Sequence, residues 1–191
     1  MSTVVVVRKR GFACIAADTL TKWGSAKESA DYIAGNSKLV PAGDSWLGVT
    51  GGATYKTILR DWFAGRRPRL DSPLAIFRTW QTLHKAMKER YFLQPGTAEG
   101  LESSQVDVLI ANPRGIFGIG AHRTAQEYSR FYAYGSGSSY AMGALWALYD
   151  DPTLDAEALA RRAVEAAAEF DDATGLPVES RRIRIAPSRQ R

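Results

Sequence analysis

The sequence predicts an α+β protein in which central β-sheets carry a pair of helices on each outer face. Candidate strands occur in three groups, at the start, in the middle and at the end of the chain. Two pairs of candidate helices separate these groups, so the order is neither an alternating βα pattern nor an all-β one. Because helices and sheets must each bury an apolar face, the layer rules then favour a sandwich with helices outside.

The composition is that of one folded domain spanning residues 1–191. Hydrophobic residues make up 45% of the chain, enough for a sizeable core, and the 24% charged fraction argues against disorder. No apolar run approaches the ~20 residues that cross a bilayer, and four opening valines are too few for a secretory signal. The single cysteine, Cys14, cannot form an internal disulfide. We therefore expect a cytoplasmic protein with no membrane association.

The formal net charge of +5 does not by itself predict a nucleic-acid partner. Much of the excess lies in residues 66–69 and in the arginines after residue 180. Neither cluster contains interleaved aromatic residues or a recognisable nucleic-acid-binding motif. We expect no nucleic-acid binding.

The first half of the chain begins with a hairpin. Thr3–Val7 is a β-branched run typical of a buried strand, and Phe12–Ala17 is its return strand after a polar turn that ends in glycine. Residues 19–37 lack periodicity and predict a long loop. Lys38–Val40 and Ser45–Thr50 predict two further strands.

Two helices follow these strands. A glycine pair precedes an apolar stripe of helical spacing that includes Tyr55, Leu59 and Trp62. Ser72 and Pro73 then open a second helix as N-cap and first helical residue, and a second apolar stripe follows.

The second half repeats the order of strands and helices. Residues 93–104 are rich in turn formers, and three strands are predicted at Val106–Ala111, Ile116–Ile119 and Glu127–Tyr134. One helix should follow with Ser138 or Ser139 as cap, and with Met142, Leu145, Trp146 and Leu148 facing inward. A second helix begins near Thr153, with Asp155 and Glu157 complementing its dipole, and runs to Phe170. Ser180–Ile185 predicts the closing strand.

The amino end offers a nucleophile and a base on one residue. Methionine is removed when residue 2 is small, and Ser2 qualifies. Its α-amine, with a reference pKa of ~7.7–8.0, could then accept the proton of its own hydroxyl. A nearby lysine ammonium would lower the pKa of that amine, and an aspartate would hold the lysine. Asp18 and Lys38 are the candidates for these two roles.

Five segments carry a resemblance to a known family over essentially the whole chain. They are residues 2–11 together with Asp18, Gly35–Leu39, Leu47–Gly52, Tyr134–Ser138 and Asp171–Gly175. The chain resembles the proteasome β-type peptidases of the N-terminal-nucleophile hydrolases, particularly HslV and the β-proteobacterial proteasome homologues. This resemblance implies a four-layer αββα sandwich and a threonine-type or serine-type endopeptidase.

The resemblance also assigns site residues. The nucleophile of the family falls on Ser2, where the family has threonine, and its aspartate and lysine fall on Asp18 and Lys38. Thr3 is a rival nucleophile that would need further trimming. The resemblance implies that the N–H of Gly48 binds the oxyanion and that Trp46 and Thr50 belong to the substrate pocket. The supporting polar residues of the family fall on Ser136, Asp171 and Thr174.

The implied assembly is a homo-oligomeric double ring that encloses the sites. The longer loop before Lys38 favours the β-proteobacterial group and two heptameric rings, whereas similarity to HslV favours a dodecamer of hexamers. A ring-shaped AAA+ unfoldase is the implied partner, and unfolded protein or peptide is the implied substrate. No cofactor is expected, and the sequence leaves open whether a metal binds, since His84 and His122 are isolated.

Two other functions remain open at this point. If Trp46 fills the peptide pocket, the same residues could run an amidohydrolase that acts on a small amide. A catalytically silent ring is the third reading.

Overall fold

Two β-sheets pack face to face in the computed structural model, which describes residues 2–98 and 100–187. The first sheet has the strand order β12-β1-β2-β13, and all its neighbouring strands are antiparallel. Its strands are β1 (Thr3–Lys9), β2 (Phe12–Asp18), β12 (Phe131–Gly135) and β13 (Val178–Arg184). The second sheet has the order β11-β10-β9-β6-β5. Its strands are β5 (Leu39–Ala42), β6 (Ser45–Val49), β9 (Val108–Asn112), β10 (Gly115–Ile119) and β11 (Ala125–Tyr128).

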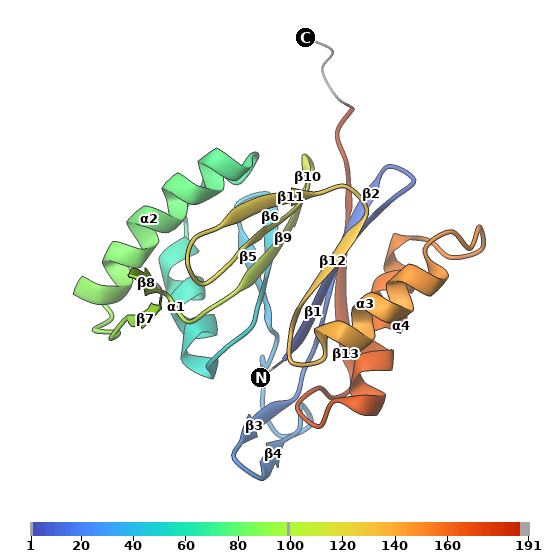
Figure 1. Cartoon of the computed structure of the whole chain (residues 1–191), viewed down its shortest axis with the longest axis horizontal. Coiled ribbons are helices and arrows are strands. Elements are labelled where there is room, and N and C mark those ends of the chain that lie inside the picture. The colour runs from blue at the N-terminus through green and yellow to red at the C-terminus, as the bar shows by residue number, and fades with distance from the viewer. Residues whose placement is uncertain (1, 99, 188–191) are drawn as a thin grey trace.

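Four helices complete the sandwich as its outer layers. Helices α1 (Ala53–Phe63) and α2 (Pro73–Glu89) cover the second sheet, and α3 (Ser138–Leu148) and α4 (Ala156–Phe170) cover the first. Figure 1 shows the resulting order of helix, sheet, sheet and helix from one side of the molecule to the other. The predicted α+β class and its layer order are confirmed.

Strand β1 is buried on both faces, as its unbroken valines predict. Val5 and Val7 pack toward α3 and α4, whereas Val4 and Val6 pack between the two sheets. This alternation is the two-residue period of a strand. The amino end of the chain therefore leads into a strand whose first five residues are fully buried.

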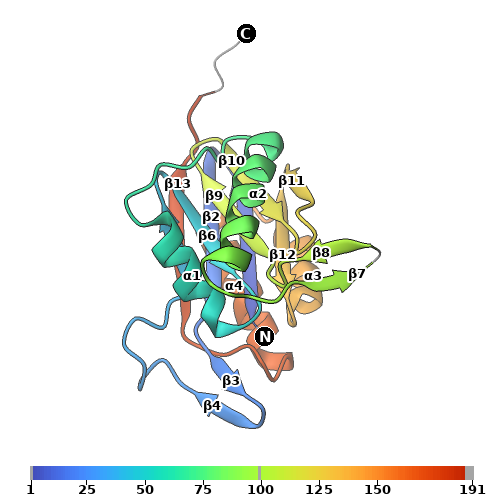
Figure 2. The ribbon, with the colours of Figure 1, turned by 90° about the vertical axis from the view of Figure 1, so that its left-hand side faces the viewer.

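Two short hairpins occupy regions that the sequence predicts as loop. They are β3 (Thr21–Trp23) with β4 (Ala26–Glu28), and β7 (Gly96–Ala98) with β8 (Leu101–Ser103). Figure 2 shows both hairpins projecting away from the layers. Strands of three residues with largely exposed side chains carry too little periodicity to be recognised in the sequence.

The prediction of one strand over Glu127–Tyr134 is wrong. The chain leaves the second sheet at the end of β11, turns at Ser129 and Arg130, and enters the first sheet as β12. Tyrosine and phenylalanine on both sides of the turn give the segment a continuous β-type composition. The break between the two sheets is therefore hidden in the sequence.

The N-cap of α2 agrees with the prediction, that of α3 differs, and α4 begins at Ala156 rather than near Thr153. Ser72 caps α2 by accepting from the N–H of Ala75 at 3.4 Å, and Asp155 caps α4 by accepting from Ala158 at 2.8 Å. For α3 the N-cap is Gly137 and no side chain caps the helix, so the predicted serine cap is wrong. Trp146, expected to face inward, is 80% exposed on α3.

Candidate active site

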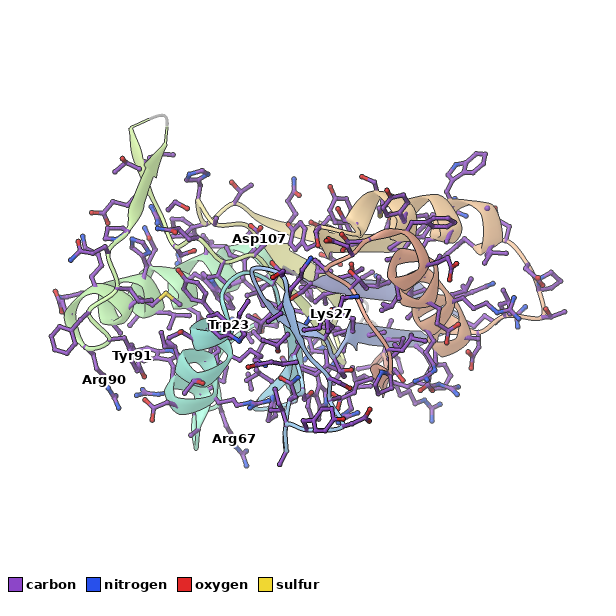
Figure 3. The ribbon with its side chains drawn as sticks, turned by 90° about the horizontal axis from the view of Figure 1, so that it is seen from below. Trp23, Lys27, Arg67, Arg90, Tyr91 and Asp107 are labelled. Carbon is purple, nitrogen blue, oxygen red and sulfur yellow. The ribbon has the colours of Figure 1, made fainter. Side chains whose placement is uncertain are left out.

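Ser2 lies at the end of the sandwich where β1 begins and where the β3–β4 hairpin projects. Figure 3 shows this end of the molecule, with Trp23 and Lys27 of the hairpin lying across it. Ser2 lines a pocket of about 90 Å³. The other lining residues come from the segment after β2, the start of β5, the end of β6 and the start of α1: Leu20, Thr21, Lys22, Trp23, Lys38, Val49, Gly51, Gly52, Ala53 and Lys56.

Asp18 and Lys38 form a buried ion pair beside Ser2. The Lys38 Nζ donates to Asp18 Oδ1 at 2.7 Å, and the two side chains are 4% and 0% exposed. The same Asp18 oxygen accepts from the N–H of Thr3, the residue after Ser2, at 2.9 Å. The long loop between Asp18 and Lys38 therefore still delivers the lysine to the aspartate, as the resemblance implies.

The second oxygen of Asp18 is also occupied. It accepts from the N–H groups of Leu20 at 3.1 Å and Gly175 at 3.2 Å. A buried carboxylate costs free energy unless it is paired and hydrogen-bonded, and Asp18 meets both conditions. The carboxylate thus holds Lys38, the start of β1 and the loop after α4 in one fixed arrangement.

The amine of Lys38 is easier to deprotonate than an exposed lysine. Burial lowers the pKa of Lys38 below its ordinary value, and the nearby Asp18 carboxylate partly opposes this shift. Asp171 opposes it more weakly. A lysine in this state can exchange a proton with a neighbouring group more readily than one in water.

A second hydrogen-bonded group surrounds Asp171. Its Oδ2 accepts from the hydroxyls of Ser136 at 2.7 Å and Thr174 at 2.6 Å. The Thr174 hydroxyl lies 2.6 Å from that of Thr3, and because its single proton goes to Asp171, Thr3 is the donor in this contact. The backbone N–H of Ser136 donates to the carbonyl of Ser2 at 3.0 Å. The three supporting residues named by the resemblance are therefore brought together around Ser2 and Thr3.

Gly135 allows this close approach. A Cβ at this position would lie 1.7 Å from the Ser2 carbonyl oxygen, so any side chain here would displace Ser2. Its φ of +106° is also one that other residues rarely adopt. The glycine-rich turn after β12 is thus required by the contact between β12 and the amino end.

The structure places Gly48, the expected oxyanion donor, inside the second sheet. Gly48 lies within β6, between β5 and β9, so its N–H points to a neighbouring strand. A Cβ there would lie 2.2 Å from Val4, which shows that this glycine serves the packing between the sheets. It is not among the described residues that line the pocket.

The two expected pocket residues, Trp46 and Thr50, contact other groups in the described part of the chain. Trp46 packs beside the cluster between the sheets, with the Arg181 guanidinium 4.8 Å from its ring centre. The Thr50 hydroxyl donates to the carbonyl of Asp107 at 3.0 Å. In the described part of the chain Val49 and Gly51 line the pocket instead of these two residues.

The sequence reasoning missed Val49, Gly51 and Lys56 as pocket residues. The available signal was the glycine pair itself, since a strand that runs into a helix through two glycines exposes backbone N–H groups at its end.

Thr3, the rival nucleophile, is fully buried within β1 and is not a lining residue in the described part of the chain. Across residues 2–98 and 100–187, no cluster of three or more histidine, cysteine or acidic side chains is arranged to hold a metal ion. Within the same ranges, no helix is long and apolar enough to cross a membrane.

Comparison with solved structures identifies the family. BPH from Thiobacillus denitrificans is 59% identical to this chain, with 97% of this chain and 100% of that one covered and a TM-score of 0.94. The chain belongs to the BPH family. A second structure, Thiobacillus denitrificans BPH in complex with epoxomicin, matches with the same identity and coverage and a TM-score of 0.93. No family model and no curated protein matches the chain.

A more distant neighbour shares the fold of this chain. Eukaryotic HslV from Trypanosoma brucei is 21% identical, with 95% of this chain and 99% of that one covered and a TM-score of 0.70. At this identity the likeness shows the fold alone, which is the sandwich of the N-terminal-nucleophile hydrolases. Membership of the BPH family, at 59% identity over nearly the whole chain, makes the chain a proteasome-like hydrolase.

Proposed function

We propose that this BPH chain hydrolyses peptide bonds with Ser2 as its N-terminal nucleophile, after removal of Met1. The observation that carries the proposal is that Ser2 lines the same pocket as Lys38, whose amine is bonded to the buried Asp18. A hydroxyl beside a buried lysine and aspartate is the arrangement that nucleophilic catalysis needs.

The reaction would proceed in two halves. The α-amine of Ser2 takes the hydroxyl proton while Oγ bonds to the scissile carbonyl carbon, and the resulting tetrahedral intermediate expels the amine product, which receives that proton. Water then attacks the remaining ester, releasing the acid and restoring the hydroxyl. The Lys38 ammonium would stabilise the neutral form of the amine, and the Asp18 carboxylate would keep the lysine in position.

The oxyanion donor would be Gly51. Its N–H makes no hydrogen bond within residues 2–98 and 100–187, and Gly51 lines the pocket together with Ser2. An unused amide at the developing negative charge is the usual means of stabilising a tetrahedral intermediate. Asp171, with Ser136 and Thr174, would fix the backbone of Ser2 and Thr3.

Epoxomicin tests the proposal directly, because a structure of the Thiobacillus denitrificans relative contains this compound. We expect the purified protein to lack Met1 and to gain one epoxomicin per chain by intact mass spectrometry. The adduct should map to Ser2 and disappear in Ser2→Ala, which should also lose peptide hydrolysis. Retention of Met1, or an adduct that survives in Ser2→Ala, would contradict the proposal.

The assembly would be a homo-oligomeric double ring in the cytoplasm, with two heptameric rings preferred over two hexameric ones. Unfolded protein or peptide would be the substrate, supplied by a ring-shaped AAA+ partner. Peptide libraries compared with small amides would distinguish a peptidase from an amidohydrolase.

A further inference from the structure

The pocket beside Ser2 contains three lysines, and their charges are not compensated in the same way. Lys38 is paired with Asp18, and Lys22 is paired with Asp172. Lys56 instead donates to a neutral amide, Asn36 Oδ1, at 2.8 Å. Within the described ranges no ion pair involves Lys56, so the pocket holds one cation without a carboxylate partner.

Lys56 is held in a defined position by Asn36. Asn36 is 7% exposed, and its Nδ2 donates to the carbonyl of Thr19 at 2.7 Å. The Thr21 hydroxyl donates to the same oxygen that accepts from Lys56, at 3.2 Å. An ammonium has three donors, and Asn36 takes one of them. The cation is therefore fixed at the pocket wall with donors left for a ligand.

The surrounding charges favour an incoming anion. Burial, together with Lys38 and Arg60, lowers the pKa of Lys56, which means that the local environment disfavours its positive charge. The two nearby carboxylates are engaged elsewhere, Asp18 with Lys38 and Glu179 with the hydroxyl of Ser37. A carboxylate that enters the pocket would compensate the positive charge of Lys56.

We propose that Lys56 makes the pocket select an acidic side chain, glutamate or aspartate, on the substrate residue that contributes the scissile carbonyl. The proposal rests on the proposed function of Ser2. Ser2 and Lys56 line the same pocket. When the scissile carbonyl lies at the Ser2 hydroxyl, the substrate side chain nearest to this pocket belongs to the residue that contributes the carbonyl. A carboxylate would then accept from the Lys56 ammonium, and hydrogen bonds between charged groups are roughly twice as strong as neutral ones.

The test compares two capped peptides that differ only in glutamate or glutamine at this residue. In the wild-type assembly, hydrolysis rates give the ratio of the kcat/KM values for the two peptides. In Ser2→Ala, calorimetry gives the ratio of their affinities, since binding needs no nucleophile. We expect a preference for glutamate of about tenfold or more, because both side chains can accept a hydrogen bond from Lys56 but only glutamate adds the attraction between opposite charges in a partly buried pocket. The preference should fall toward unity in Lys56→Gln and in Lys56→Met and persist in Lys56→Arg.

Arg67→Gln is the matched control, since it removes the same charge from an exposed residue outside the pocket. It should keep the wild-type ratio. Equal affinity for the two peptides, or a preference that survives both Lys56→Gln and Lys56→Met, would overturn the proposal even if epoxomicin labels Ser2. Glutamate-selective binding in a protein that epoxomicin does not label would instead count against the nucleophile and leave the role of Lys56 intact.

Discussion

The Thr174 hydroxyl links β1 to Asp171, since it donates to the Asp171 carboxylate and accepts from the Thr3 hydroxyl. Thr174→Val keeps the shape of the side chain but leaves Asp171 and Thr3 with one hydrogen bond fewer each. The Thr174 residue is only 4% exposed. An unsatisfied buried polar group costs about 1–3 kcal/mol. We expect a loss of this size in the free energy of unfolding, measured by urea titration, together with slower labelling by epoxomicin.

Thr174→Ser is the control for this variant because it retains the hydroxyl. It should keep most of the stability and most of the labelling rate. If the valine and serine variants proved equally stable, the hydrogen bonds around Asp171 would contribute nothing to the position of Ser2.

At the scale of single residues, the sequence predicted the polar side chains better than the backbone groups. Asp18, Lys38, Asp171 and Thr174 carry distinctive chemistry, and the structure brings them together near Ser2. Gly48 and Gly51 are the same residue type and differ only in position. Gly48 lies within β6, whereas Gly51 lies two residues beyond its end. A backbone donor is defined by strand register, which the residue types around it do not reveal.

At the scale of elements, the titration of the Cys14 thiol reports how closely α4 packs against β2. The thiol is fully buried in the cluster beneath α4, and burial raises its pKa to about 12, with Glu157 and Asp155 contributing further. A raised pKa means that the folded chain holds this proton more tightly than the unfolded one. The thiol's contribution to stability is complete below about pH 9 and is lost as the pH rises toward 12.

We therefore expect the free energy of unfolding of the wild-type protein to fall by about 1.4 kcal/mol more than that of Cys14→Ala between pH 8 and pH 10. The comparison cancels the titration of the other groups, and urea titrations at both pH values measure it. Parallel pH profiles for the two proteins would mean that the thiol is accessible to solvent and that α4 does not close over β2.

Elements with a strong period were predictable, and those without it were not. The apolar stripe of α2 and its Ser72–Pro73 start gave a helix close to the observed one. The β3–β4 hairpin and the break between β11 and β12 lack such signals, because tertiary pairing alone decides them. The predicted layer order is correct despite these errors, because it depends on the grouping of strands and helices along the chain rather than on their boundaries.

At the scale of the whole molecule, the outer face of α3 and α4 is unusually apolar. Trp146 is 80% exposed and Phe170 is 67% exposed, and the Phe170 ring lies 5.5 Å from that of Tyr140. Gly143 lies between Tyr140 and Trp146 along α3, and a Cβ there would meet nothing within 4 Å. Exposed apolar patches of this kind mark surfaces that contact another protein. The proposed homo-oligomer supplies another copy of this chain as the partner.

We expect Trp146→Glu to shift the protein to a species smaller than the wild-type assembly, measured by size-exclusion chromatography with light scattering. A carboxylate buried without a partner in a contact between copies would destabilise that contact, whereas the isolated subunit would keep its fold because Trp146 is outside the core. Phe92→Glu is the control, since Phe92 is 82% exposed just beyond the end of α2, on the opposite outer layer. An unchanged mass for Trp146→Glu, or an equal loss in Phe92→Glu, would show that this face does not hold the copies together.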